Sequence, residues 1–326
     1  MSLADLWSIL PQTLLEGLLL GFVYAMIALG YTMVYGVLEL INFAHSEIFM
    51  IGGVAGLEVF RYLSNGKGLE VHNPFLLLFL ALVVGGGVAG LVAVLVERLA
   101  YRPLRKRGTI NRLVPLITAI GVSFLLQDLV RAIEALWHNE FFLRYPTYPL
   151  LEKTFFLPLG MTIQTKAILV IVIAVLMLLG LNYLVNHTKL GRAIRAVAQD
   201  MNTAALMGIN PDAIISRTFL IGGSLGGVAG VLFGLMYTVI SPYSGFLPGI
   251  KAFTAAVLGG IGNIPGAVLG GLVLGQLETV GGTYLSFLTA GNFGSEYASV
   301  LAFLTLILIL LFRPQGLLGQ NVGEKV

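Results

Sequence analysis

The residues of this chain that could do chemistry lie within apolar sequence. The 326-residue sequence is 57% hydrophobic and only 11% charged, whereas soluble domains average about 25% charged residues. An ionisable side chain at the centre of a membrane-spanning helix costs roughly 2.5–3.5 kcal/mol, so each one needs a pairing, packing or transport role. The candidates for a translocation path or gate are Asn42, His45, Ser46, Glu47, Lys251, Gly259, Gly260, Gly262, Asn263 and Pro265.

The densest polar cluster in the apolar segments spans Asn42 to Glu47. These side chains either line a polar vestibule beside a transport path, or cap and hydrogen-bond the start of a helix. We favour a structural or gating role over direct substrate binding. Glu47 is also the residue best suited to a proton or sodium site. Lys251 either faces the outer mouth or extends its amine to the membrane interface.

Several chemistries have no support in the sequence. It contains no GxxxxGK[ST] phosphate loop, so ATP is not bound by that route. Cysteine is absent, which excludes disulfides and thiolate metal sites. The four histidines lack metal-ligand spacing, and no Ser-His-acid arrangement is indicated. Nothing in the sequence therefore argues for an enzyme, and we expect no catalytic residue, metal or cofactor.

Continuous apolar runs predict an all-α, polytopic membrane bundle. About 20 apolar residues cross the hydrocarbon as a helix, and full-length candidates lie near 10–36, 75–100, 113–137, 165–186, 213–240 and 296–312. Regions 41–63 and 251–285 are apolar but interrupted. We expect about eight transmembrane helices in a single domain, residues 1–326, with broken or re-entrant segments. No cleavable signal is indicated, because Asp5 precedes a first apolar run too long for a signal peptide.

The run of glycines and proline from Gly259 to Gly266 predicts a break within region 251–285. We expect two helical pieces that meet within the membrane, with the Asn263 amide satisfying freed backbone groups. Region 41–63 carries a similarly placed glycine pair and is interpreted as a counterpart in a two-half internal repeat. A parallel repeat puts the N-terminus in the cytoplasm, whereas a single crossing by 41–63 puts it outside.

Basic residues predict the orientation. The clusters at 101–107 and 189–195, and Arg313 after the last span, are placed on the cytoplasmic side by the positive-inside rule. The segment 138–164 then lies outside. Span 213–240 ends outside, so region 251–285 must begin and end there.

Residues 188–211 have the pattern of a short amphipathic cytoplasmic helix. Apolar residues recur at helical spacing on one face, and arginines and amides occupy another. A protein that only passes solute has little need of such a segment, whereas one driven by a soluble motor does. We therefore interpret it as a coupling helix, with the coupling residues Leu190, Gly191, Arg192, Ile194, Arg195, Val197, Gln199, Asp200, Ala204, Met207 and Gly208.

Four segments, in order, resemble signature motifs of one family. They begin at Ile41 (INFAHSE), Leu190 (LGRAIRAVAQD), Ala255 (AAVLGGIGNIPGA) and Arg313 (RPQGL). On these motifs the chain is similar, over nearly its whole length, to the inner-membrane permeases of branched-chain amino-acid ABC importers of the LivH type. Ser46 stands where glycine is common in the family.

The resemblance implies a multi-pass permease of the bacterial inner (cytoplasmic) membrane. It also implies a second homologous permease subunit, two cytoplasmic ATPase subunits and an extracytoplasmic solute-binding protein that delivers leucine, isoleucine or valine. Segment 188–208 would lie in a groove of an ATPase subunit. Permeases of urea or short amides are related, and that substrate is the alternative. An ion-coupled secondary transporter and a passive channel are two further alternatives.

Overall fold

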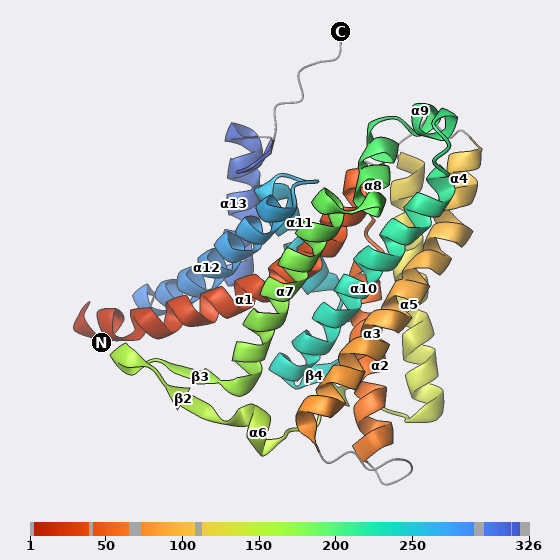
Figure 1. The fold of residues 1–326 in the computed structure, drawn as a ribbon. Coiled ribbons are helices and arrows are strands. Elements are labelled where there is room, and N and C mark those ends of the chain that lie inside the picture. The colour runs from red at the N-terminus through yellow and green to blue at the C-terminus, as the bar shows by residue number, and fades with distance from the viewer. Residues whose placement is uncertain are drawn as a thin grey trace.

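The computed structural model describes residues 3–38, 42–64, 73–107, 113–289, 297–313 and 315–319, and it is a helical bundle (Figure 1). Within these residues, six helices are long and apolar enough to cross a membrane, which confirms the predicted polytopic helical class. Five of them coincide with predicted spans, and the sixth lies in region 251–285. The helices that contain these spans are α1 (Leu3–Leu38), α3 (Pro74–Val96), α5 (Leu113–Trp137), α7 (Thr165–His187), α10 (Pro211–Tyr237) and α12 (Ile264–Leu288).

Three further helices complete the bundle. They are α2 (His45–Ser64), α11 (Phe246–Gly259) and α13 (Ala298–Phe312). The predicted span 296–312 corresponds to α13, which has 15 residues and is shorter than the usual span. α3 continues through a π-helical turn, η1 (Glu97–Tyr101), into α4 (Arg102–Lys106).

One end of the bundle carries short strands that an all-α prediction did not include. β1 (Leu143–Arg144) pairs antiparallel with β4 (Val239–Ile240), and β2 (Thr154–Phe156) pairs with β3 (Thr162–Gln164). α6 (Pro149–Glu152) and the 3₁₀ turn η2 (Pro158–Gly160) lie in the same segment. We call this the strand end. The N-terminal part of α1 also lies at this end. A hydrogen bond marks the contact, in which the Thr162 amide donates to Gln12 Oε1 at 2.9 Å.

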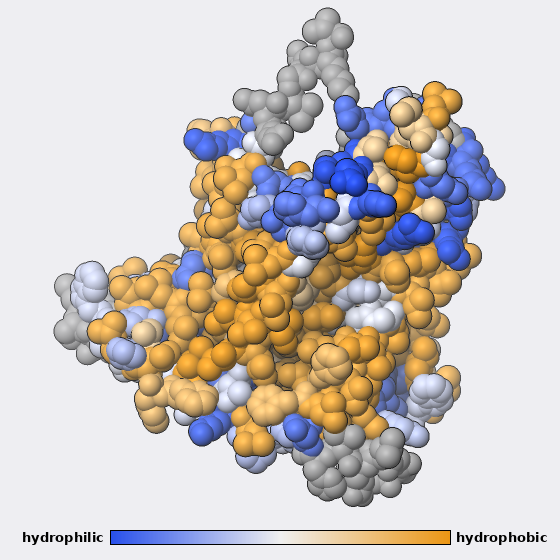
Figure 2. Space-filling view, in the orientation of Figure 1, coloured by the Kyte–Doolittle hydropathy of each residue, from blue (hydrophilic) through white to orange (hydrophobic). Residues whose placement is uncertain are grey.

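The opposite end holds α4, α8 (Lys189–Gln199) and α9 (Met201–Leu206) (Figure 1). We call it the basic end. Hydrophilic residues gather over these helices, above a broad hydrophobic surface (Figure 2). The N-terminal end of α1 lies at the strand end, opposite the basic end.

Glycines allow the central helices to approach closely. A Cβ at Gly52 of α2 would collide with the Cα of Gly227 in α10, and one at Gly53 would lie 2.9 Å from the Gly230 carbonyl oxygen. Small residues permit such packing in lipid, where backbone proximity replaces the hydrophobic drive. The expected interruption of 41–63 is therefore wrong, because α2 is continuous and its glycine pair is a packing surface.

The predicted break in region 251–285 is confirmed. α11 ends at Gly259 and α12 begins at Ile264. Gly260 and Gly262 adopt φ of 101° and 90°, a left-handed conformation that favours glycine. α12 runs beside α1 (Figure 1), and a Cβ at Gly271 would lie 2.7 Å from the Ala25 nitrogen.

The C-terminal segment 315–319 packs against this break. The Leu317 amide donates to the Leu258 carbonyl at 2.8 Å, and the Leu318 amide donates to that of Gly259 at 3.0 Å. Carbonyls at a helix C-terminus lack intrahelical partners, so the segment satisfies groups that α11 leaves free. Because the segment follows α13, the break lies toward the basic end (Figure 1). The motif residues Ile41 and Pro314 lie outside the described residues.

Candidate functional site

The polar residues predicted at 42–47 are brought together at the first turn of α2, and all four are buried. The Asn42 carbonyl accepts from the His45 amide at 3.1 Å, and Asn42 Oδ1 accepts from the Ala44 amide at 3.1 Å. Asn42 Oδ1 also accepts from the Tyr101 hydroxyl at 2.8 Å. Asn42 thus supports the entry into the helix, as the structural interpretation expected, and ties it to η1.

Glu47 is fully buried and faces α5. Its Oε1 accepts from Gln127 Nε2 at 2.8 Å and from the hydroxyls of Ser123 and Ser46, each at 3.2 Å. Its Oε2 has no hydrogen-bond partner among the described residues, and a Cβ at Gly245 would lie 2.8 Å from it. The carboxylate is therefore half-satisfied, with one oxygen directed to the chain that enters α11.

Ser123 and Gln127 were missed in the sequence. Their spacing of four residues puts both on one face of α5, and that spacing is the signal that could have identified them.

His45 fills a slot between α1 and α10. A Cβ at Gly30 would collide with its Nε2, and one at Gly226 would lie 3.0 Å from its Cε1. Its ring meets Tyr31 edge-on, with centroids 4.7 Å apart. Nε2 has no hydrogen-bond partner among the described residues. The imidazole is thus fixed by shape where α1, α2 and α10 meet.

A small cavity lies between this cluster and the break. It is lined by Tyr31, Tyr35, Asn42, Phe253, Ala256 and Ile261, and its volume is about 10 Å³. A space of that size holds about one water molecule. This cavity is therefore too small for an amino acid in this conformation.

Lys251 forms an ion pair with Glu278 of α12, and both side chains are 12% exposed. The Tyr24 hydroxyl of α1 donates to the other oxygen of Glu278 at 2.8 Å. Lys251 is therefore tied to α12 through this ion pair. The pairing with Glu278 was not predicted, because an ion pair between two helices leaves no local signal in the sequence.

Asn263 begins α12. Its Oδ1 accepts from the Gly266 amide at 3.0 Å, and its Nδ2 donates to the Leu318 carbonyl at 2.8 Å. Pro265 lies in the first turn, where its missing N–H costs nothing. As predicted, the amide satisfies backbone groups at the break, and it also holds the C-terminal segment.

The sequence predicted a single helix in segment 188–211, but the structure has two helices there, α8 and α9. The prediction of one helix was therefore wrong. α8 ends at Gln199 because Asp200 is extended (φ −158°). Asp200 caps α9, since its Oδ1 accepts from the amides of Asn202 and Thr203 at 2.8 and 3.1 Å. Gly208 has φ of 82° and leads into α10.

The spacing did predict which faces are buried. Gly191, Ile194, Val197 and Ala204 are buried, Leu190 is half-buried, and Arg192, Arg195, Gln199, Asp200, Met207 and Gly208 are exposed. Gly191 permits the tight turn from α7, because a Cβ there would collide with the Val185 carbonyl oxygen. Arg195 donates to that same oxygen. α8 is therefore fixed to the end of α7.

An ion-pair network ties α10 to α4 at the basic end. Asp212 accepts from Arg102 at 2.7 Å and from Arg105 at 2.5 Å. Fully buried Glu97 accepts from Arg105 at 3.2 Å and from Ser216 at 2.7 Å. Arg102 and Arg105 belong to the basic cluster that we used to predict the orientation. They thus also hold α4 against α10.

A second charged cluster lies at the strand end. Ligand atoms of Glu58, Glu134 and His138 lie within 4.8 Å of one another, a grouping with the composition of a metal site. Arg61, however, lies among them, with NH1 2.9 Å from Glu58 and 3.6 Å from Glu134. Its NH2 pairs with Glu140 at 2.5 Å. The Arg61 guanidinium already lies where a metal ion would have to bind, so we interpret the group as an ion-pair network.

Taken with the apolar spans, these features define a class. The chain is a multi-pass membrane protein with buried polar groups, a helix break and a peripheral helix pair, as in a transport permease.

The comparisons identify the family within that class. The model of the family described as branched-chain amino acid transport system / permease component matches residues 13–310, and the chain belongs to this family. It is 44% identical to the high-affinity branched-chain amino acid transport system permease protein BraD of Pseudomonas aeruginosa, over 97% of both chains. It is 40% identical to the corresponding LivH protein of Escherichia coli, again over 97% of both chains. No solved structure matches the chain.

Proposed function

We propose that the chain is the transmembrane permease subunit of an ATP-binding-cassette importer for branched-chain amino acids, in a bacterial inner membrane. The observation that carries the proposal is the identity of 40–44% over 97% of the chain to two proteins named for that transport. The six apolar spans support the membrane location. The urea or amide alternative receives no support from these relatives.

The partners follow from the same proposal. The chain lacks a phosphate loop, so ATP must be hydrolysed by other subunits. We propose two cytoplasmic ATPase subunits, a second homologous permease in a heterodimer and an extracytoplasmic solute-binding protein. The phrase "transport system permease protein" in the relatives' names supports the view that such a chain acts within a larger system.

α8 and α9 are proposed as the coupling element. Their buried apolar face lies against the bundle, and Leu206 and Met207 at the end of α9 are 88% and 78% exposed. Large apolar side chains at a basic, polar end suit insertion into a partner's groove. Because Arg195 bonds to the end of α7, displacement of this element would be passed directly to a spanning helix.

The polar cluster at the start of α2 and the break before α12 are proposed as gate elements of an alternating-access path. The proposal is supported by the cavity of about 10 Å³, because Asn42 of the first element and Ile261 of the second both line it. Affinity and most selectivity would lie in the binding protein. Helix ends at the break would steady the carboxylate and ammonium of the solute.

An ion-coupled secondary transporter remains the second candidate, on one observation. Glu47 is buried, and its Oε2 has no hydrogen-bond partner in the part of the chain that the structure describes, which is the kind of group a proton or sodium site uses.

The two candidates separate in proteoliposomes. The complete complex should take up labelled leucine only with ATP and binding protein present. Uptake by the purified chain alone, under a proton or sodium gradient and without ATP, would instead establish the secondary transporter. Flux needing neither ATP nor a gradient would indicate a channel.

A further inference from the structure

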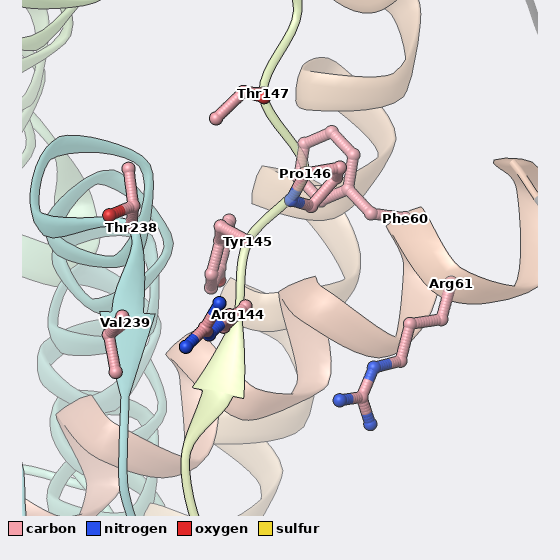
Figure 3. Close-up of a pocket in the computed structure, with 8 residues that line it drawn as sticks. All are labelled: Phe60, Arg61, Arg144, Tyr145, Pro146, Thr147, Thr238 and Val239. Atoms are coloured by element: carbon pink, nitrogen blue, oxygen red, sulfur yellow. The ribbon is translucent and has the colours of Figure 1, made fainter.

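The strand end contains a cavity that none of the proposed gate residues lines. Its volume is about 590 Å³, within the range of roughly 300–1,000 Å³ that is typical of small-molecule sites. It opens between β1, β4 and the C-terminal part of α2 (Figure 3). It is lined by Phe60, Arg61, Arg144, Tyr145, Pro146, Thr147, Thr238 and Val239.

The wall of the cavity that carries Arg144 is held by contacts with β4 and α2. Arg144 pairs in register with Val239 across the β1–β4 ladder. The neighbouring Tyr145 ring packs edge-on against Phe60, with centroids 5.7 Å apart, and its hydroxyl donates to the Gly53 carbonyl. Burial raises the pKa of the Tyr145 phenol, so it stays a neutral donor. Arg144 therefore projects from a rigid support.

The two arginines of the cavity differ in their charge balance. Arg61 is held by Glu58 at 2.9 Å and Glu140 at 2.5 Å, with Glu134 3.6 Å away. Arg144 is exposed and has no ion pair among the described residues. Figure 3 shows its guanidinium turned toward β4, whereas Arg61 extends from α2. Of the two arginines, Arg144 is thus the one without an ion pair to any residue that the structure describes.

Apolar surface lies beside that cation. Val239 is 38% exposed and Pro146 is half-buried, and both line the cavity. The exposed Thr147 adds a hydroxyl. A guanidinium beside an aliphatic wall matches a small molecule with a carboxylate and a branched side chain, since guanidinium–carboxylate hydrogen bonds are charge-assisted.

We propose that this cavity is a receiving site for a free α-amino acid on the outer face of the permease. Arg144 binds the carboxylate, and Val239 and Pro146 contact the aliphatic side chain. The inference rests on the proposed function, because it assumes that the solute is an aliphatic amino acid. The site holds the solute after the binding protein releases it and before the gate near α2 opens.

The test is direct binding of leucine to the purified full chain in nanodiscs, without binding protein, measured by saturation-transfer NMR. Leucinamide, which lacks the carboxylate, is the matched probe. The variants are Arg144→Gln and, as control, Arg131→Gln, because Arg131 is exposed, lies in the outer half of α5 and does not line the cavity. Leucine should bind saturably, and Arg144→Gln should weaken it roughly tenfold or more, the usual effect of losing a hydrogen bond to a charged group.

Leucinamide should bind the wild type weakly, and neither variant should change that binding. The proposal is overturned if leucine and leucinamide bind equally, if both arginine variants bind leucine like wild type, or if leucine shows no saturable binding up to about 10 mM. It is also overturned if Arg144→Gln leaves leucine binding intact but weakens association of the binding protein, since the cavity then receives an acidic side chain. Failure of the wild-type complex to import leucine would instead reject the proposed function.

Discussion

Replacing Gly226 by alanine should overpack the slot that holds His45. The added Cβ would lie 3.0 Å from His45 Cε1 and 3.2 Å from Nε2, closer than ordinary van der Waals contact. The ring cannot retreat, because it is 1% exposed and Gly30 and Tyr31 close its other sides. Overpacking of this kind costs about 1–3 kcal/mol. At a helical glycine with open space around it, by contrast, replacement by alanine should stabilise the helix by up to about 1 kcal/mol.

The control is Gly121→Ala in α5, because nothing lies within 4 Å of a Cβ there. In mixed micelles, the free energy of unfolding of the Gly226→Ala variant should be about 1–3 kcal/mol lower than that of the Gly121→Ala variant. His45→Ala empties the slot, so Gly226→Ala should cost nothing in that background. The double-mutant cycle then returns a coupling energy of about 1–3 kcal/mol between the two sites. An equal cost in both backgrounds would mean that His45 does not fill this slot.

Three further predictions concern the charged and capping residues. Replacing Lys251 or Glu278 alone by methionine should destabilise the bundle by roughly 3–5 kcal/mol, and the double replacement should cost less than the sum, as a double-mutant cycle would measure. Asn263→Ala should cost about 1 kcal/mol of α12 capping and accelerate amide exchange in segment 315–319; unchanged exchange would mean that this residue does not hold the segment. Asp212→Asn should cost about 1 kcal/mol at low salt, because its two arginine partners are partly exposed, and less in 1 M salt; a salt-independent cost would exclude an electrostatic origin.

The sequence predicted those features whose cause is local. The helical spacing of Ile194 and Val197 predicted the buried face of α8, because a strongly amphipathic helix has only one face it can bury. The glycines and proline before Gly266 predicted the break between α11 and α12 for the same kind of reason. Left-handed backbone and a missing N–H are properties of single residues.

Features that depend on a distant partner were not predictable. The glycine pair at 52–53 resembles the one at 259–260 in sequence, yet the first packs against α10 and the second ends a helix. Likewise, Lys251 gives no sign in the sequence that its partner is Glu278 of the next helix. The end of α8 at Asp200 was missed because the apolar spacing continues across it, while the side chain caps α9. The apolar periodicity favours a continuous helix at this position, whereas the Asp200 cap favours a new one, and the structure has the new helix.

The variants Gly208→Asp and Arg195→Glu should both uncouple ATP hydrolysis from uptake. Arg195→Glu also removes the hydrogen bond to the end of α7. Its effect on uptake would therefore combine weaker binding of the ATPase subunit with weaker packing of α8 on α7. Met207→Glu is a cleaner change, because this side chain is 78% exposed and has no packing role to lose. Arg107→Glu is its control, an exposed position at the same end outside α8 and α9.

The measurement is the number of leucine molecules imported per ATP hydrolysed, in proteoliposomes that contain the complete complex and binding protein. If α8 and α9 carry force from the ATPase subunits to the bundle, Met207→Glu lowers this ratio at least about tenfold, the scale of one lost hot-spot contact, and Arg107→Glu leaves it near the wild-type value. A Met207→Glu complex that keeps the wild-type ratio would contradict transmission of force through this helix pair.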